Sequence, residues 1–219
     1  MKAFVAGATG QTGRRIVKEL VNRGIEVRCL VRDVEAAKQI LPEAAELVKG
    51  DLLEPETLTA AVEGCDVVLS AAGASPSFNP LGPFNVDLVG GKNLTNAAKQ
   101  AGAKHLVLVS SLCVSKLFHP LNLFFLILVW KRQAEKYIAN SGLTYTIVRP
   151  GGLRNEDTPG NIVMKGADTL FEGSIPRDRV AKVCVEALSE PAAKNKIVEV
   201  VVKEEAPQQP IGELFASVS

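Results

Sequence analysis

The sequence contains few residues that could bind a metal and no excess of charge of either sign. Its only histidines are His105 and His119, and its four cysteines are far apart, with no C-x-x-C pair. A zinc site is therefore not expected, and the cysteines are predicted to be buried, reduced thiols of a reducing compartment. A net charge of +1 creates no overall field that would attract nucleic acid. These features predict a soluble globular protein with no metal centre and no nucleic-acid partner.

The sequence also lacks an apolar run long enough to cross a membrane. The longest apolar stretch, from Leu121 to Trp130, is about half the roughly 20 residues that a membrane helix needs. It is either the start of a buried helix or a surface that contacts a membrane or a partner, because two phenylalanines and a tryptophan lie close together in it. The first motif begins at residue 7, so we expect no targeting peptide and a cytoplasmic protein, with peripheral membrane contact as an alternative.

What the sequence does contain is a glycine-rich turn between an apolar run and a helical pattern. Residues 1–6 are mostly apolar, and the helical pattern begins at Arg14. This order of strand, turn and helix places a dinucleotide pyrophosphate at the start of the helix. A purely structural turn is the alternative. The predicted pyrophosphate-binding residues are Gly7, Thr9, Gly10, Gln11, Thr12 and Gly13.

Apolar runs alternate with amphipathic stretches along the whole chain, which predicts βαβ units and a mostly parallel sheet. Strands are expected at 2–6, 26–31, 46–49, 67–71, 105–109, 145–149 and 197–202. Helices are expected at 11–23, 34–41, 55–63, 84–101, 122–141 and 176–189, and a loop at 75–83. The predicted fold is a single-domain Rossmann fold, a doubly wound α/β sheet over residues 1–205. Residues 206–219 form a C-terminal tail, with a short helix or a loose end at 211–216.

The end of the second predicted strand indicates which dinucleotide is bound. An acidic residue there would bind the ribose 2′-hydroxyl of NAD, whereas a basic residue accommodates the 2′-phosphate of NADP. Arg32 occupies this position and Asp33 follows it. We therefore predict NADP as the cofactor; a solvated Arg32 paired with Asp33 is the alternative.

Residues after the third and fourth predicted strands complete the cofactor side. Asp51 can accept a hydrogen bond from the adenine amino group while Leu52 packs on the ring; alternatively, Asp51 is the N-cap of the helix at 55–63. Ala72 and Gly73 are small, as the wall of a cofactor groove requires.

Motifs in the second half of the chain point to a known superfamily. They are Val109-Ser110-Ser111, Lys131-x-x-x-Glu135 and Tyr145-Thr146-Ile147-Val148-Arg149-Pro150-Gly151-Gly152. With the G-x-x-G-x-x-G turn, they resemble the atypical, NmrA-like branch of the short-chain dehydrogenase/reductase superfamily. The resemblance implies that Ser111 and Lys131 are catalytic. It also implies that Ser110, Lys131, Pro150 and Gly151 lie against the cofactor.

One residue departs from the superfamily's catalytic pattern. Complete members have a tyrosine four residues before the lysine, and the lysine lowers the pKa of that tyrosine so that it transfers a proton near neutral pH. Ile127 occupies this position and has no proton to donate. Tyr137, six residues after the lysine, projects roughly 120° away from it on a helix and is predicted to pack. The two residues that match the catalytic pattern also have alternative interpretations. Lys131 could be a surface cation, and Ser111 could form hydrogen bonds only with the local backbone.

Two narrower resemblances bear on function. The glycine turn with Leu30-Val31-Arg32-Asp33 is similar to the biliverdin reductase B family, which also reduces flavins with NADPH. The segments Trp130-Lys131-Arg132 and Ser141-Gly142-Leu143, with those around them, are similar to the dehydrogenase-like domain of a chloroplast inner-envelope translocon (Tic) component. In that family Pro/Ser-rich repeats follow the domain, and they are absent here. Anchoring of the reductase bound by those repeats is therefore not carried over to this chain. Because we expect no transit peptide, a cyanobacterial-type cytoplasmic protein fits better than an imported plastid protein.

Three functions follow from these patterns. The first is an NADP(H)-binding, redox-responsive regulator or scaffold that lacks the usual catalytic tyrosine. The alternative is an NADPH-dependent oxidoreductase that transfers a hydride directly to a flavin, a quinone or a similar acceptor. A third is a protein-interaction module that retains the turn but not the ligand. The partner is an unknown small molecule or protein, and the oligomeric state is left open.

Overall fold

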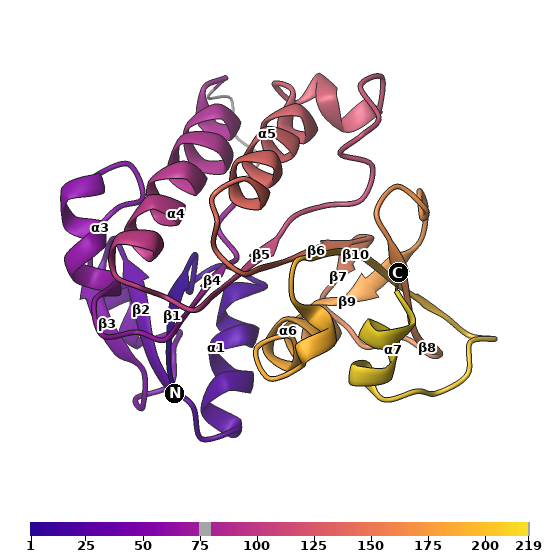
Figure 1. The fold of residues 1–219 in the computed structure, drawn as a ribbon, viewed down its shortest axis with the longest axis horizontal. Helices are drawn as coiled ribbons and strands as arrows, with labels where there is room; N and C mark the ends of the chain where they lie inside the picture. Colours follow the sequence, from indigo (N-terminus) through magenta and orange to yellow (C-terminus); the bar gives the residue numbers. More distant parts are fainter. Residues whose placement is uncertain (75–79, 219) are drawn as a thin grey trace.

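Eight strands form the central sheet of the computed structural model, which describes residues 1–74 and 80–218 (Figure 1). Their spatial order is β3, β2, β1, β4, β5, β6, β10, β8. Neighbouring strands are parallel except β10 and β8, which pair antiparallel. The strand order reverses between β1 and β4, which is where open α/β sheets bind ligands.

The elements have the following bounds. The strands are β1 (Lys2–Ala6), β2 (Glu26–Val31), β3 (Glu46–Lys49), β4 (Val67–Ser70), β5 (His105–Val109), β6 (Tyr145–Pro150), β7 (Gly152–Arg154), β8 (Asn161–Gly166), β9 (Ser174–Pro176) and β10 (Lys196–Lys203). The α-helices are α1 (Gly13–Asn22), α2 (Val34–Lys38), α3 (Pro55–Val62), α4 (Gly91–Gln100), α5 (Ile127–Ala139), α6 (Arg177–Glu186) and α7 (Ile211–Ser217). A π-helical segment, η1 (Phe84–Gly90), leads into α4, and η2 (Pro120–Leu123) and η3 (Pro191–Ala193) are 3-10 turns.

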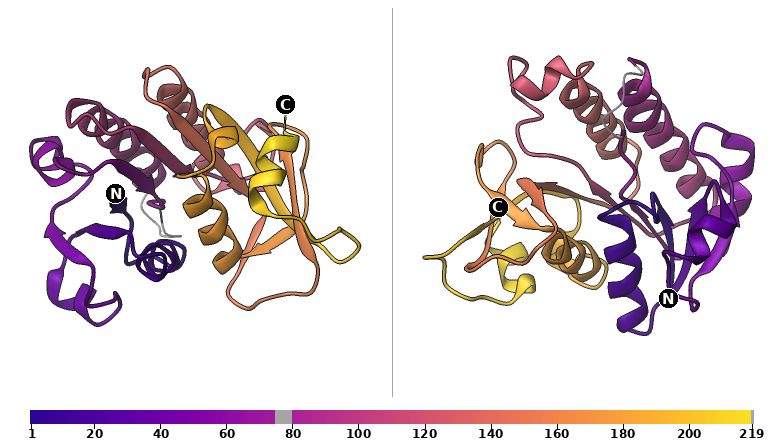
Figure 2. Two further views of the ribbon diagram at one scale, coloured as in Figure 1. Left: turned by 60° about the horizontal axis from the view of Figure 1, so that its bottom comes forward. Right: turned by 180° about the vertical axis from the view of Figure 1, so that it is seen from behind.

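Helices cover both faces of the sheet. Helices α3, α4 and α5 lie on one face, and α1 and α6 lie side by side on the other (Figures 1 and 2). Every residue of β4 and of β5 is buried, as expected for strands covered on both sides. One apolar cluster fills the face beneath α1 and α6, and a second fills the face beneath α3, α4 and α5. The predicted doubly wound Rossmann fold is confirmed.

All seven predicted strands are present, and three further strands were not predicted. Strands β7 and β9 have three residues each and form a separate parallel pair. Strand β8 is an edge strand with one buried residue, Met164. A half-exposed edge strand lacks the continuous apolar run that marks the central strands, so the sequence pattern does not reveal it.

The predicted helix at 122–141 begins later than expected. Phe125 and Leu126 have φ values of 54° and 59°, in the left-handed region, so α5 begins only at Ile127. Before it, the residues between Leu117 and Leu126 are mostly exposed, with Phe118 97% and Leu123 85% exposed. The interpretation of 121–130 as a buried helix start is therefore wrong for 121–126. The predicted loop at 75–83 lies partly outside the described residues, and its last two residues, Gly82 and Pro83, are helical.

The chain ends in a short helix instead of a loose end. Helix α7 buries Leu214 and Phe215 in the cluster beneath α1 and α6. The four cysteines are free and buried, as predicted. Burial raises the pKa of the Cys29 and Cys184 thiols to about 12, so both stay protonated. None of the helices in the described part of the chain is both long enough and apolar enough to span a bilayer.

Candidate functional site

A groove with a volume of about 430 Å³ opens beside the point where the strand order reverses. Its walls come from the glycine turn, the ends of β2, β3 and β4, and the start of η1. Eight predicted cofactor-binding residues line it together: Gly7, Thr9, Gly10, Arg32, Asp51, Leu52, Ala72 and Gly73. The fold thus brings most of the predicted cofactor side into one concave surface.

The glycine turn is packed too tightly for side chains at its first and third glycines. Gly7 has a φ of 74°, and its carbonyl accepts a hydrogen bond from Gly10 N at 3.1 Å. A Cβ on Gly13 would lie 2.0 Å from the Gly7 carbonyl oxygen. Gln11, Thr12 and Gly13 do not line the groove. Thr12 is buried at the start of α1, and Arg14 and Arg15 bind the Gln11 side chain.

Arg32 is exposed at the end of β2 and lines the groove. Arg32 and Asp33 both belong to the described part of the chain, where no ion pair joins them. The Asp33 carboxylate instead accepts a hydrogen bond from Ala36 N at 3.0 Å and caps α2. The guanidinium therefore remains available for an anionic ligand.

Asp51 and Leu52 lie at the groove end of β3. Asp51 Oδ1 accepts a hydrogen bond from Leu53 N at 2.9 Å, which closes a local turn. Helix α3 is preceded by Glu54 at the N-cap position, so the interpretation of Asp51 as its N-cap is wrong. Leu52 packs against Gly90 at the end of η1.

A smaller cavity continues the groove beneath α5. Ser110, Lys131, Asp87 and Ala72 line it, and Ala72 lines the groove as well. The Lys131 side chain is only 15% exposed, and its Nζ forms an ion pair with Asp87 Oδ1 at 2.7 Å. Lys131 is therefore not a surface cation. The structure brings Ser110 and Lys131 together at the end of the site opposite Arg32.

A buried network of charges lies behind Ser110. The Ser110 hydroxyl donates to Glu135 Oε1 at 2.5 Å, and Arg149 Nη2 donates to Glu135 Oε2 at 2.7 Å. Arg149 also forms ion pairs with Glu199 at 3.2 Å and Asp168 at 2.9 Å. Burial would lower the pKa of the Arg149 guanidinium, but the hydrogen bonds and charge of Glu135 raise it. Arg149 therefore stays charged within this network.

The remaining predicted residues lie around this end of the site without lining either cavity. Ser111 is half-buried just after β5. Pro150 ends β6 and accepts a hydrogen bond from Leu112 N at 3.0 Å. A Cβ on Gly151 would lie 2.6 Å from the Gly173 carbonyl oxygen, so this glycine allows the chain before β9 to approach β6.

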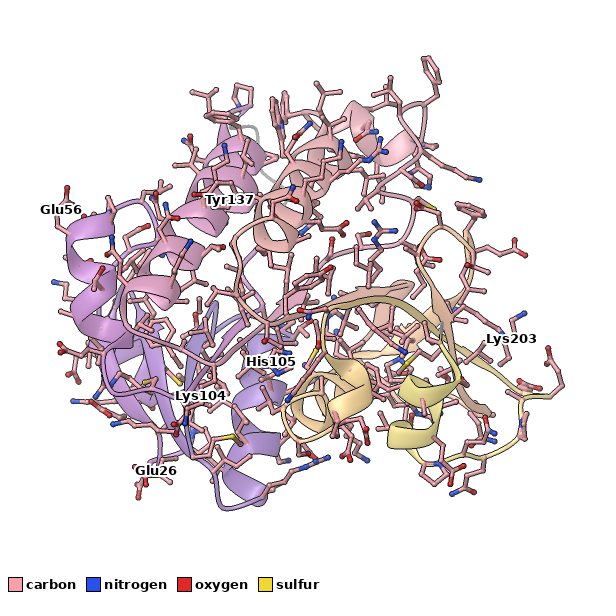
Figure 3. The ribbon with its side chains drawn as sticks, in the orientation of Figure 1. Glu26, Glu56, Lys104, His105, Tyr137 and Lys203 are labelled. Carbon is pink, nitrogen blue, oxygen red and sulfur yellow. The ribbon has the colours of Figure 1, made fainter. Side chains whose placement is uncertain are left out.

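Tyr137 lies on the face of α5 that packs against α4 (Figure 3). Its hydroxyl donates to Asn96 at 2.7 Å, and Lys92 lies 5.3 Å from the centre of its ring. The prediction that Tyr137 packs away from Lys131 is confirmed.

Sequence reasoning missed Asp87 and the ion pairs around Arg149. Charged residues inside apolar strands, such as Arg149 in β6 and Glu199 in β10, were a usable signal, because charges enter a core only when they are paired. No comparable signal marks Asp87, since it lies in a helical pattern where acidic residues are ordinary.

Comparisons with known proteins agree with this geometry. The model of a family described as NAD(P)H-binding matches residues 7–191. An uncharacterised chloroplast protein of Arabidopsis thaliana is 48% identical and covers 99% of this chain and 82% of its own length. Sanguinarine reductase of Eschscholzia californica is 34% identical over 94% of this chain and 90% of its own length.

Two further comparisons concern the predicted resemblances and the fold. The pea chloroplast protein TIC 62 is 36% identical over 98% of this chain, which spans 45% of that protein's length. The predicted similarity to the Tic component is confirmed. A solved structure from Bacillus halodurans, described as a candidate NAD-dependent epimerase/dehydratase, is 30% identical with a TM-score of 0.87 and covers 99% of both chains.

Proposed function

Because this chain belongs to the NAD(P)H-binding family, we propose that it is an NADPH-dependent reductase whose acceptor takes a hydride without a proton from the protein. One observation carries the proposal. The largely covered Lys131 lies beside Ser110 in the small cavity, whereas the position of the proton donor is occupied by Ile127. Sanguinarine reductase, at 34% identity along nearly the whole chain, supports a reductase.

The residues of the groove fit NADP(H) from one end to the other. The backbone of the glycine turn and the start of α1 would hold the pyrophosphate, since helix N-termini attract anions. Arg32 would bind the 2′-phosphate, and Asp51 and Leu52 the adenine. Ser110 and Lys131 would hold the nicotinamide end, with Lys131 donating to the ribose hydroxyls, and Pro150 and Gly151 lie nearby at the end of β6. The bound cofactor would supply a hydride.

The missing tyrosine limits the acceptors that such a site can reduce. A carbonyl needs a proton at oxygen as the hydride arrives at carbon, and Ile127 cannot give one. A flavin, a quinone or an iminium ion accepts the hydride alone, and any proton follows from water. We therefore propose acceptors of these classes.

A substrate panel tests the proposal. NADPH oxidation is followed with a flavin, a quinone, a cyclic iminium ion and an aldehyde. We expect turnover with at least one of the first three and none with the aldehyde. Lys131→Ala should lower turnover, whereas Lys136→Ala, an exposed lysine on the same helix, should not. Aldehyde reduction at the same rate, or no turnover with any acceptor, would contradict it.

The exposed apolar segment before α5 favours a second candidate, a redox-responsive regulator that binds a membrane surface. We define the apolar ledge as the exposed side chains Leu117, Phe118, Leu121, Leu123, Phe124, Phe125 and Leu126. Residues 112–134 contain no Asp or Glu, and Lys116 and Arg132 flank the ledge. Apolar side chains between basic ones suit an anionic membrane.

Vesicle flotation separates the two candidates. A regulator should bind anionic vesicles more than neutral ones, and the bound fraction should change between NADPH and NADP⁺. The substitution Phe118→Ser with Phe124→Ser should abolish binding, while Ile40→Ser, at an exposed residue outside the ledge, should not. Absence of vesicle binding in all conditions would exclude this role.

A further inference from the structure

A carboxylate that no motif singles out lies directly against Lys131. The Asp87 side chain is 2% exposed, and its Oδ1 lies 2.7 Å from Lys131 Nζ. Its Oδ2 accepts a hydrogen bond from Ala74 N at 3.3 Å. Both oxygens are thus held, one by α5 and the other by the chain that follows β4.

Asp87 reaches this position from a π-helical turn. Segment η1 leads without a break into α4, with Gly90 and Gly91 at the junction. Its turns are wider than those of an α-helix, so the 3.6-residue period does not predict which of its residues face α5. Single π-helical turns are frequent at functional sites.

The ion pair changes what Lys131 does to its surroundings. A lysine lowers the pKa of a neighbouring acid because its positive charge favours the ionised form. Asp87 places a negative charge within hydrogen-bonding distance of that ammonium group. At position 127, one helical turn away, the electrostatic effects of the two charges therefore nearly cancel. Ile127 lies one turn before Lys131 on the same side of α5. The site therefore lacks both a phenol and the unbalanced charge that would activate one.

We propose that Asp87 is a positioning residue that determines acceptor specificity. It holds Lys131 in place for the nicotinamide ribose and cancels the positive charge that proton donation would require. The site is then confined to acceptors that take only a hydride. This inference rests on the proposed reductase function.

The two classes of reaction differ by one proton. A carbonyl gains a hydride at carbon and a proton at oxygen to give an alcohol, while NADPH becomes NADP⁺. An iminium ion gains only the hydride at carbon, the electron pair of its C=N bond moves to nitrogen, and a neutral amine forms. Iminium reduction needs no acid, so neither Ile127 nor Asp87 slows it. Carbonyl reduction needs an acid, and Asp87 keeps it slow even if an acid is introduced at position 127.

An introduced thiol at position 127 measures the local charge without any turnover. Cysteine is smaller than isoleucine and fits the site, and the four native cysteines are buried. The rate of alkylation of Ile127→Cys is followed against pH, alone and with Asp87→Asn. We expect the thiol pKa in the double variant to be lower by about one unit, because the charge of Lys131 is then unbalanced. Adding Lys131→Met to the double variant should return the thiol pKa to its value in Ile127→Cys alone.

A tyrosine at position 127 carries the test to chemistry. Ile127→Tyr with Asp87→Asn should reduce an aldehyde on the order of ten-fold faster than Ile127→Tyr alone, in line with a pKa difference of about one unit. The distant carboxylate variant Asp33→Asn serves as a control and should give no such gain. Equal thiol pKa values with and without Asp87, or equal aldehyde rates, would overturn the inference.

The outcomes separate this inference from the proposed function. Turnover of a flavin by the native protein with unchanged thiol pKa values would refute the role of Asp87 and leave the reductase intact. A shifted thiol pKa in a protein that binds NADPH but reduces no acceptor would support the electrostatic role of Asp87 and refute the reductase function.

Discussion

The Ser110 hydroxyl donates its hydrogen bond to Glu135, at 2.5 Å, and therefore faces the small cavity only with its lone pairs. The same carboxylate accepts a hydrogen bond from Arg149 Nη2 at 2.7 Å. Ser110 can thus accept a hydrogen bond from a ligand, such as the amide of nicotinamide, but cannot polarise a carbonyl.

The network predicts unequal costs for its members. Ser110→Ala should lower the free energy of unfolding by about 1 kcal/mol, since Arg149 still satisfies Glu135. Glu135→Gln should cost about 3 kcal/mol, because it leaves buried Arg149 with a weaker partner. Urea unfolding measures both, and the double variant should cost less than the sum. A Glu135→Gln cost no larger than that of Ser110→Ala would show that the ion pair adds nothing.

Two glycine-to-alanine changes, one in the glycine turn and one at the start of α4, should differ in their effect on stability. In Gly13→Ala the new Cβ would lie 2.0 Å from the Gly7 carbonyl oxygen, and backbone cannot give way as a side chain does. We expect a loss of about 2 kcal/mol in unfolding free energy and a loss of NADPH binding. Gly91→Ala, at the start of α4 with its nearest neighbour at 3.5 Å, should be neutral or stabilising by up to about 1 kcal/mol. Thermal unfolding with and without NADPH distinguishes them.

Arg32 predicts cofactor preference. Arg32→Ala should weaken NADPH binding roughly ten- to 150-fold, because a charge-assisted contact to phosphate contributes about 1.5–3 kcal/mol. NADH, which lacks the 2′-phosphate, should bind nearly as before. A fluorescence titration with both cofactors measures the ratio, and Lys38→Ala, an exposed cation on α2, is the matched control. Equal losses for the two cofactors would contradict the assignment.

The sequence specified the fold better than it specified the site. Continuous apolar runs such as His105–Val109 and glycines at fixed spacing are local signals, and they correctly placed the seven main strands and the turn. Asp87 depends on a π-helical turn, and the contact with Lys131 joins residues 44 positions apart. The late start of α5 at Ile127 follows two consecutive residues, Phe125 and Leu126, with left-handed backbone conformations, which no apolar pattern reveals.

His105 makes stability depend on pH in a window separate from that of the carboxylates. It lies at the start of β5 in the interior of the protein (Figure 3), where burial, aided by the charge of Lys194, lowers its pKa from 6.5 to about 4. The Thr146 hydroxyl donates to the Ala193 carbonyl at 2.7 Å, so its oxygen accepts from Nε2–H of a neutral His105 at 2.9 Å.

Because the unfolded chain binds the proton more readily, this contribution is full above pH 6.5 and is lost as the pH falls toward 4. From about pH 7.5 to about pH 5 the loss should be about 2 kcal/mol. The lowered pKa values of Asp66, Asp157 and Asp168 act only below about pH 4, the ordinary range of Asp. Urea unfolding across this range should show the decline in the native protein and in His119→Gln but not in His105→Gln. A decline of equal size in His105→Gln would assign it to other groups.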